Sequence, residues 1–324
     1  MKTRTHILQL LTEKGELSVH QLTEALGISR QRIHQILREM VEEKQVKKLG
    51  TSPRVYYQVL SPQSTKKVVL ISDEERNFLA EHFLIVDLMG QLSEGLEGFT
   101  QWCHDRKLPV EKTIKEYIHT MGKYLAFFDA NGLIDGIQKL NNTKEISNCM
   151  EAVYYADFYA IERFGKTKLG ALLHHAKVSQ SKRLMRQIVE KTSGKLHRLI
   201  HKFKIDAVGY VPPTLKRDVQ IMNELKKGYK LPLPHISIQK VYLREPVPQK
   251  SLKRIEDRIL NARNTIVVNE LSSFKTVLLI DDALGSGATM TETACKLIAK
   301  KVATRVIGFA ITGSYKGFEV IAEV

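Results

Sequence analysis

The chain has 324 residues, 43% of them hydrophobic, and a formal net charge of +15 at pH 7. This length is sufficient for two or three domains with hydrophobic cores. The excess of positive charge indicates a polyanionic partner, because net charge affects association more than fold. Nucleic acid is the first candidate for that partner.

Cysteine usage and hydropathy exclude several protein classes. Cys103, Cys149 and Cys295 are widely spaced and form no CxxC pair, so the sequence predicts neither a disulfide framework nor a zinc or other metal site. No apolar run approaches the roughly 18 residues of a membrane span, and no hydrophobic leader follows Met1. We therefore expect a cytoplasmic protein without a membrane partner.

Residues 1–60 carry the pattern of three short helices followed by a hairpin. Apolar residues recur at helical spacing until Gly15. Ser18 is a suitable N-cap for a second helix, and Gly27 is a suitable C-cap for it. The turn of residues 26–29 then leads into a third helix. This segment resembles the winged helix-turn-helix domain of bacterial transcription regulators.

The third helix, residues 30–41, buries an apolar face and exposes side chains of the types that contact bases and phosphates in a major groove. Residues 45–59 are typical of a β-hairpin whose tip, residues 50–53, has basic neighbours, as in a wing. We expect DNA contacts from Ser29, Arg30, Gln31, Arg32, His34, Gln35 and Arg38 in the helix and from Lys47, Lys48 and Arg54 in the wing. The alternative is a winged helix that serves protein contacts.

The charge of this segment is modest, with ten Lys/Arg against six Asp/Glu in residues 1–60. A single copy is therefore expected to bind DNA weakly. A homodimer would place two copies on successive half-sites.

Residues 61–150 are predicted to form an all-α connector. The residues Ser72 to Glu75 have the form of a capping box. Further helices are predicted over residues 110–128 and 143–158. The sequence Trp102-Cys103-His104 lacks further ligand partners, so core packing is favoured there over metal binding.

The most informative stretch lies within residues 151–324. Val277 to Ile280 form an apolar run suited to a buried parallel strand. Two acids and a small, Gly-rich loop follow at the edge where open α/β sheets bind ligands. Carboxylates can accept hydrogen bonds from a ribose diol, and glycines before a helix N-terminus favour a phosphate. The predicted ribose 5-phosphate site consists of Asp281, Asp282, Ala283, Leu284, Gly285, Ser286, Gly287, Ala288 and Thr289.

This stretch resembles the signature of type I phosphoribosyltransferases, which bind phosphoribosyl pyrophosphate (PRPP). Strand, acid pair and loop occur in the family's order, although Gly285 stands where many members carry a hydroxyl residue. The resemblance implies an α/β domain with a mainly parallel sheet, and Mg²⁺ that arrives with PRPP. A Walker-type loop is excluded because no Lys follows the glycines.

The resemblance extends over roughly residues 160–313 to the ComF-like subgroup. A strand is predicted over residues 205–211, followed by a loop that the family uses for pyrophosphate, here Pro212, Pro213, Thr214, Lys216 and Arg217. By resemblance, Arg258 belongs to a hood that closes over phosphates. Further strands are predicted over residues 305–312 and 317–324. The zinc-binding cysteines of many ComF-like proteins are absent.

Residues 166–205 hold eleven Lys/Arg and one acid, Glu190, a net charge of +10. Their apolar residues recur at helical spacing, so this segment is predicted to be an amphipathic helix pair. Its basic side chains either bind phosphate, from DNA or from a PRPP-like ligand, or form a solvated face.

Three functions remain open from the sequence. The first is a DNA-binding regulator whose C-terminal domain senses PRPP or a nucleotide. The second is an active phosphoribosyltransferase that attaches a nucleobase to ribose 5-phosphate, and the third is a ComF-like DNA uptake or processing protein. The regulator is favoured because no base-recognition pocket or catalytic residue can be identified.

Overall fold

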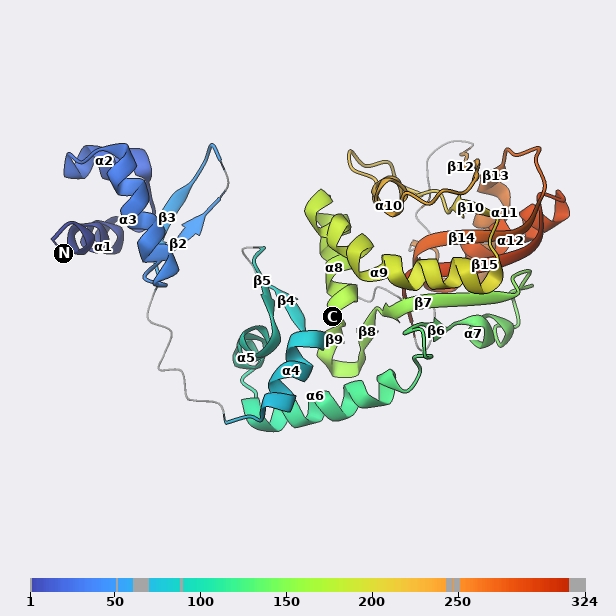
Figure 1. The fold of residues 1–324 in the computed structure, drawn as a ribbon, viewed down its shortest axis with the longest axis horizontal. Coiled ribbons are helices and arrows are strands. Elements are labelled where there is room, and N and C mark those ends of the chain that lie inside the picture. Colours follow the sequence, from blue (N-terminus) through green and yellow to red (C-terminus); the bar gives the residue numbers. More distant parts are fainter. Residues whose placement is uncertain are drawn as a thin grey trace. The chain divides into compact units, whose positions relative to one another are not determined.

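The computed structural model describes residues 2–50, 52–60, 70–87, 90–242, 247 and 251–314. The chain divides into two compact units, residues 1–69 and 70–324. Figure 1 labels most of the helices and strands of both. No helix in the described ranges is long and apolar enough to cross a membrane.

The first unit is a small three-helix domain with a three-stranded antiparallel sheet in the order β1-β3-β2. Ser18 and Gln21 form a reciprocal capping box at the start of its second helix, and Gly27 ends that helix with φ 63°. A left-handed residue is needed to turn the chain there, and glycine adopts it without strain. The elements are α1 (Lys2–Lys14), β1 (Leu17–Ser18), α2 (Val19–Leu26), α3 (Arg30–Glu42), β2 (Val46–Leu49) and β3 (Tyr56–Val59).

The first part of the second unit mixes helices and strands, so the all-α prediction for residues 61–150 is wrong. Two short strands, β4 and β5, pair antiparallel, and β6 pairs with the main sheet. The capping box of Ser72 and Glu75 is confirmed. The elements are α4 (Asp73–His82), β4 (Leu84–Val86), β5 (Leu92–Glu94), α5 (Gly95–Asp105), α6 (Val110–Leu125), β6 (Ile134–Asp135) and α7 (Ile137–Asn141).

The helix predicted over residues 143–158 is also wrong. Residues 143–151 are not helical, and β7 (Ala152–Phe158) is a strand of the main sheet. Val153, Tyr154 and Tyr155 are β-branched or aromatic and favour a strand. A strand buried on both faces shows a continuous apolar run, which periodicity alone does not separate from a buried helix.

Within the described residues, the main sheet has six strands in the order β11-β10-β14-β15-β7-β6, all parallel except β6. Leu278 and Ile280 share a core with residues of α8, α9 and α10. On the opposite face Gly308 lies against Met290 of α12, where a Cβ would be 2.7 Å from the sulfur. Helices therefore cover both faces. The strands are β10 (Ala207–Tyr210), β11 (His235–Ile236), β14 (Phe274–Leu284) and β15 (Ala303–Gly313), and the helices are α8 (Lys168–Val178), α9 (Lys182–Phe203), α10 (Ile221–Tyr229) and α12 (Ala288–Ala299).

The strands predicted over residues 205–211 and 305–312 correspond to β10 and β15, and the predicted basic helix pair corresponds to α8 and α9. The strand predicted over residues 317–324 lies outside the described residues. Smaller elements complete the unit: β8 (Ala160–Ile161), η1 (Glu162–Phe164), β9 (Gly165–Lys166), β12 (Ile238–Lys240), α11 (Ile255–Thr265) and β13 (Ile266–Val268).

An aromatic cluster joins the first part of this unit to the rest. Phe99 and Tyr117 have ring centroids 5.2 Å apart. Phe164 of η1 lies 5.2 Å from Tyr117 and 5.7 Å from Trp102. Trp102 and Cys103 are buried, as their predicted core packing requires. The cluster fixes α5 and α6 against η1.

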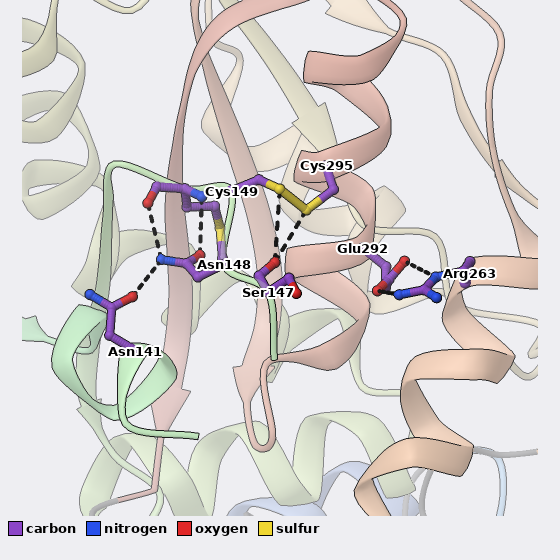
Figure 2. Close-up of a disulfide and its surroundings, with 8 residues drawn as sticks. Asn141, Ser147, Asn148, Cys149, Arg263, Glu292 and Cys295 are labelled. Atoms are coloured by element: carbon purple, nitrogen blue, oxygen red, sulfur yellow. Dashed lines mark hydrogen bonds and ion pairs between the residues drawn. A yellow bond between two sulfur atoms is a disulfide. The ribbon is translucent and has the colours of Figure 1, made fainter. Parts of the chain in front are cut away.

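A disulfide bond contradicts the expectation drawn from the cysteine spacing. Cys149, just before β7, is bonded to Cys295 of α12, with Cα atoms 5.1 Å apart (Figure 2). The two residues are 146 positions apart in the sequence and meet only because the end of the connector packs on α12. Linear spacing carries no signal for such a pair. Figure 2 also shows the ion pair between Arg263 of α11 and Glu292 of α12.

Replacing Phe99, which is fully buried, by Ala is expected to destabilise the second unit by about 3–5 kcal/mol, because the change leaves a cavity in the aromatic cluster. Urea unfolding measures this loss. Trp102 is the single tryptophan and lies in the cluster, so its fluorescence reports on this unit.

The matched control is Phe127→Ala, because Phe127 is 46% exposed. A loss for Phe99→Ala no larger than for Phe127→Ala would contradict the role of the cluster.

Candidate functional site

The candidate site lies where two neighbouring parallel strands send their connections in opposite directions. The chain leaves β10 through α10 to β11 on one side, and leaves β14 through α12 to β15 on the other. Such a switch point opens a crevice at the carboxyl ends of the strands. The backbone N–H of Val211 donates to the carbonyl of Ile280 at 2.9 Å and holds the two strand ends together.

The acid pair occupies the end of β14. The strand runs to Leu284 and not to Ile280, so Asp281 and Asp282 lie within it. The N–H of Asp282 donates to Oδ1 of Asp281 at 2.7 Å. Nζ of Lys177, from α8, donates to Oδ2 of Asp282 at 2.7 Å, and both side chains are largely shielded from solvent.

Electrostatics at the pair favour proton uptake by one carboxyl group. Burial and the neighbouring Asp282 raise the pKa of Asp281 to about 7, and Lys177 and Lys240 oppose this shift. Burial lowers the pKa of Lys240, and Asp281 acts in the opposite direction. Two carboxylates and two ammonium groups thus share a small, poorly solvated volume.

The loop after β10 is tied to the same place. Lys240 donates to Oγ1 of Thr214 at 2.9 Å, and the hydroxyl of Tyr242 donates to the Thr214 carbonyl at 2.6 Å. Arg217 donates to the carbonyl of Lys177. Pro212 is half-buried, whereas Pro213 and Lys216 are exposed. The structure thus links Thr214 and Arg217, through the two lysines, to the acid pair.

The Gly-rich loop opens α12 as predicted. Gly287 is the N-cap, with φ 79°. A Cβ there would also lie 2.2 Å from the Leu140 side chain, so both conformation and packing require glycine. The Ser286 hydroxyl accepts from the N–H of Ala288 at 3.3 Å. Ala283 continues the strand, and Thr289 lies half-buried in the first helical turn.

Lys139 of α7 contacts the Gly-rich loop and was not predicted from the sequence. Its Nζ donates to the carbonyls of Gly285 at 2.8 Å and Ser314 at 3.2 Å, and also to the Ser314 hydroxyl. Burial lowers the pKa of Lys139 to about 8. No motif marks this residue, since it comes from α7 and is 146 positions from Gly285.

Arg258 lies on α11, and its Nε donates to the carbonyl of Leu252 at 2.8 Å. This bond holds the guanidinium near the start of α11. The role of Arg258 in a hood over phosphates stays a prediction. Within the described ranges, no group of three or more His, Cys, Asp or Glu could hold a metal ion.

The first unit presents α3 as a basic helix. Ser29 accepts from the N–H of Arg32 at 3.4 Å, so its hydroxyl caps the helix. The exposed side chains of α3 include all the others predicted there, namely Arg30, Gln31, Arg32, His34, Gln35 and Arg38. Arg32 donates to Gln35 at 2.8 Å and Arg38 to Glu42 at 3.2 Å, both along the helix.

An arginine of α1 partly neutralises two acids at the C-terminal end of α3. Arg4 of α1 pairs with Glu39 and Glu43, and lowers the pKa of Glu39 by hydrogen bonding. In the hairpin of β2 and β3, Lys48 and Arg54 are exposed and Lys47 is half-buried. The basic residues of helix and wing therefore face solvent.

Comparison with known proteins identifies the first unit. Residues 2–47 match the family model of winged helix-turn-helix DNA-binding domains. No curated protein matches the chain. The predicted N-terminal winged helix-turn-helix is confirmed, and it supports a DNA-binding regulator with DNA as a partner.

Asp281→Asn is expected to stabilise the second unit at neutral pH by on the order of 1–2 kcal/mol, because it removes a poorly solvated charge. The folded pKa of Asp281 is raised, so the wild type binds more protons when folded between about pH 4 and 7. Its stability therefore falls as pH rises through that window. Urea unfolding at several pH values measures the difference.

The gain from Asp281→Asn should grow between about pH 4 and 7 and stay constant above that range. A loss of stability at pH 7.5 would show that the carboxylate contributes to folding, and would contradict its assignment as a strained binding group.

Proposed function

We propose that the protein is a DNA-binding regulator whose second unit binds PRPP or a related nucleotide, and that this ligand changes its affinity for DNA. The observation that supports the proposal is the acid pair beside a Gly-rich loop at the switch point between β10 and β14. The winged helix supplies the DNA contact.

A ribose 5-phosphate fits the chemistry of the crevice. Asp281 and Asp282 would accept hydrogen bonds from the two ring hydroxyls. The backbone N–H groups at the start of α12, around Ser286 to Thr289, would bind the 5-phosphate, which the helix dipole also favours. Lys177 pairs with Asp282, which holds its ammonium group at the site.

A pyrophosphate group would lie toward the loop after β10. Lys240 and Thr214 hold one side of that loop, and Lys216 and Arg217 add positive charge. Lysine and arginine neutralise phosphate charge as it leaves water. Mg²⁺ would be carried by the pyrophosphate, because two carboxylates with lysine neighbours do not make a separate metal site.

Regulation requires that the ligand bind the DNA-competent and DNA-incompetent states with different affinity. The size of the change cannot exceed that difference. We propose a homodimer as the DNA-binding form, because two winged helices can occupy successive half-sites.

Replacing both Asp281 and Asp282 by Asn is expected to abolish PRPP binding while the fold is retained, because the diol loses its charged acceptors. Isothermal titration calorimetry with PRPP and Mg²⁺ measures this. The control is the pair Asp218→Asn with Asp257→Asn, two exposed carboxylates of the same unit. Equal affinity in the acid-pair variant and the control would overturn the site.

Replacing Arg30, Arg32 and Arg38 by Ala is expected to abolish sequence-specific duplex binding and to reduce its salt dependence. Each lost phosphate contact lowers the slope of log K against log salt by about 0.9. Fluorescence anisotropy with a recovered genomic site measures both, with exposed Lys14→Ala as control. Specific binding that survives the triple change would show that α3 is not the reading helix.

A further inference from the structure

The longest helix of the second unit carries a basic face that the proposed function does not use. α9 spans 22 residues and buries Leu184, Ile188 and Leu196 against the sheet. Its exposed residues include Arg183, Arg186, Lys191, Arg198 and Lys202, with Glu190 as the one exposed acid of the helix.

Other lysines of residues 166–205 bond to groups within the second unit. Lys168 pairs with Glu94 at 2.7 Å, and Lys177 pairs with Asp282. Lys195 donates to the carbonyl of Ala156 at 2.7 Å. By contrast, none of Arg183, Arg186 and Lys191 forms an ion pair with a carboxylate in the part of the chain that the structure describes. Their charge is presented to solvent.

The length of the face matches a DNA duplex. At about 1.5 Å per residue, 22 residues extend about 33 Å, close to one turn of duplex at about 34 Å. Gly194 lies in the middle of the face. A Cβ built there would meet only Arg198, at 3.7 Å, so a backbone can approach the helix closely at this point.

Two surface pockets, one beside α9 and one beside α10, are lined by basic and amide side chains and by no carboxylate. One, of about 550 Å³, is lined by Asn131, His197, Arg198, His201 and Lys202. The other, of about 380 Å³, is lined by Asn223, Lys226, Lys227, Lys230 and His235. α10 packs closely on α9, where Gly228 leaves room for Val189.

We propose that the exposed faces of α9 and α10 bind the phosphate backbone of duplex DNA. Lysine, arginine and amide groups suit phosphate oxygens, which carry no sequence information. Single strands are bound by stacking on aromatic rings. The large exposed hydrophobic residues that the structure describes include no aromatic from either helix, and Tyr229 of α10 is buried. Duplex DNA is therefore the matching partner.

This surface adds sequence-independent affinity to a winged helix of modest charge. It does not depend on the PRPP site, since its residues come from the outer faces of α9 and α10.

The test replaces Arg183, Arg186 and Lys191 by Gln in the full chain and measures binding to a random 40-base-pair duplex across a range of salt. The slope of log K against log salt should fall by about 2–3, with a loss of affinity of at least tenfold at low salt. The matched control replaces Lys112, Lys115 and Lys123, on the exposed face of α6, by Gln. It removes the same charge from the same unit.

The same measurement is repeated with Arg30, Arg32 and Arg38 already changed to Ala, so that the winged helix does not mask the effect. A charge-preserving variant, with Arg183→Lys, Arg186→Lys and Lys191→Arg, should keep the wild-type slope. A slope in the Gln variant equal to that of the α6 control would overturn the proposal, as would a loss confined to single-stranded DNA.

Discussion

The second unit is organised around two like charges held side by side in a poorly solvated crevice. Asp281 and Asp282 follow four fully buried residues of β14, so neither carboxylate is well hydrated on the side of the core. Lys177 and Lys240, from α8 and β12, supply the compensating charge. Holding two carboxyl groups in this way lowers the stability of the folded state. Such destabilising arrangements are common at binding and catalytic sites. The connections that leave β10 and β14 run to opposite sides of the sheet and place the pair at their switch point.

The Gly-rich loop is connected to the segment before β7 by contacts of different kinds. Leu140 packs on Gly287, and Lys139 donates to the Gly285 carbonyl. The bond between Cys149 and Cys295 fastens the end of the same segment to α12. Any rearrangement of the loop on ligand binding must therefore alter contacts with residues 137–149, which lie between β6 and β7.

Local patterns were sufficient for part of this structure. The winged helix follows from caps at Ser18 and Gly27 and from an amphipathic α3, all of which are encoded within a few residues. The Gly-rich helix start is likewise local. Lys139, Lys240 and the disulfide were missed because each meets its partner only through tertiary packing. The predictions of an all-α connector and of a helix over residues 143–158 failed because short or fully buried strands, here β4 and β7, show no alternation of polar and apolar residues.

We propose that a ligand bound at the acid pair alters DNA binding. The most direct measurement titrates PRPP with Mg²⁺ into the protein bound to a duplex recovered from genomic DNA, and records the dissociation constant of the duplex by anisotropy. This dissociation constant should change roughly 5–150-fold at saturating PRPP, the usual range of such coupling. The change should be absent when Asp281 and Asp282 are both Asn. An unchanged dissociation constant, at PRPP concentrations that calorimetry shows to saturate the protein, would contradict the proposed coupling between PRPP and DNA.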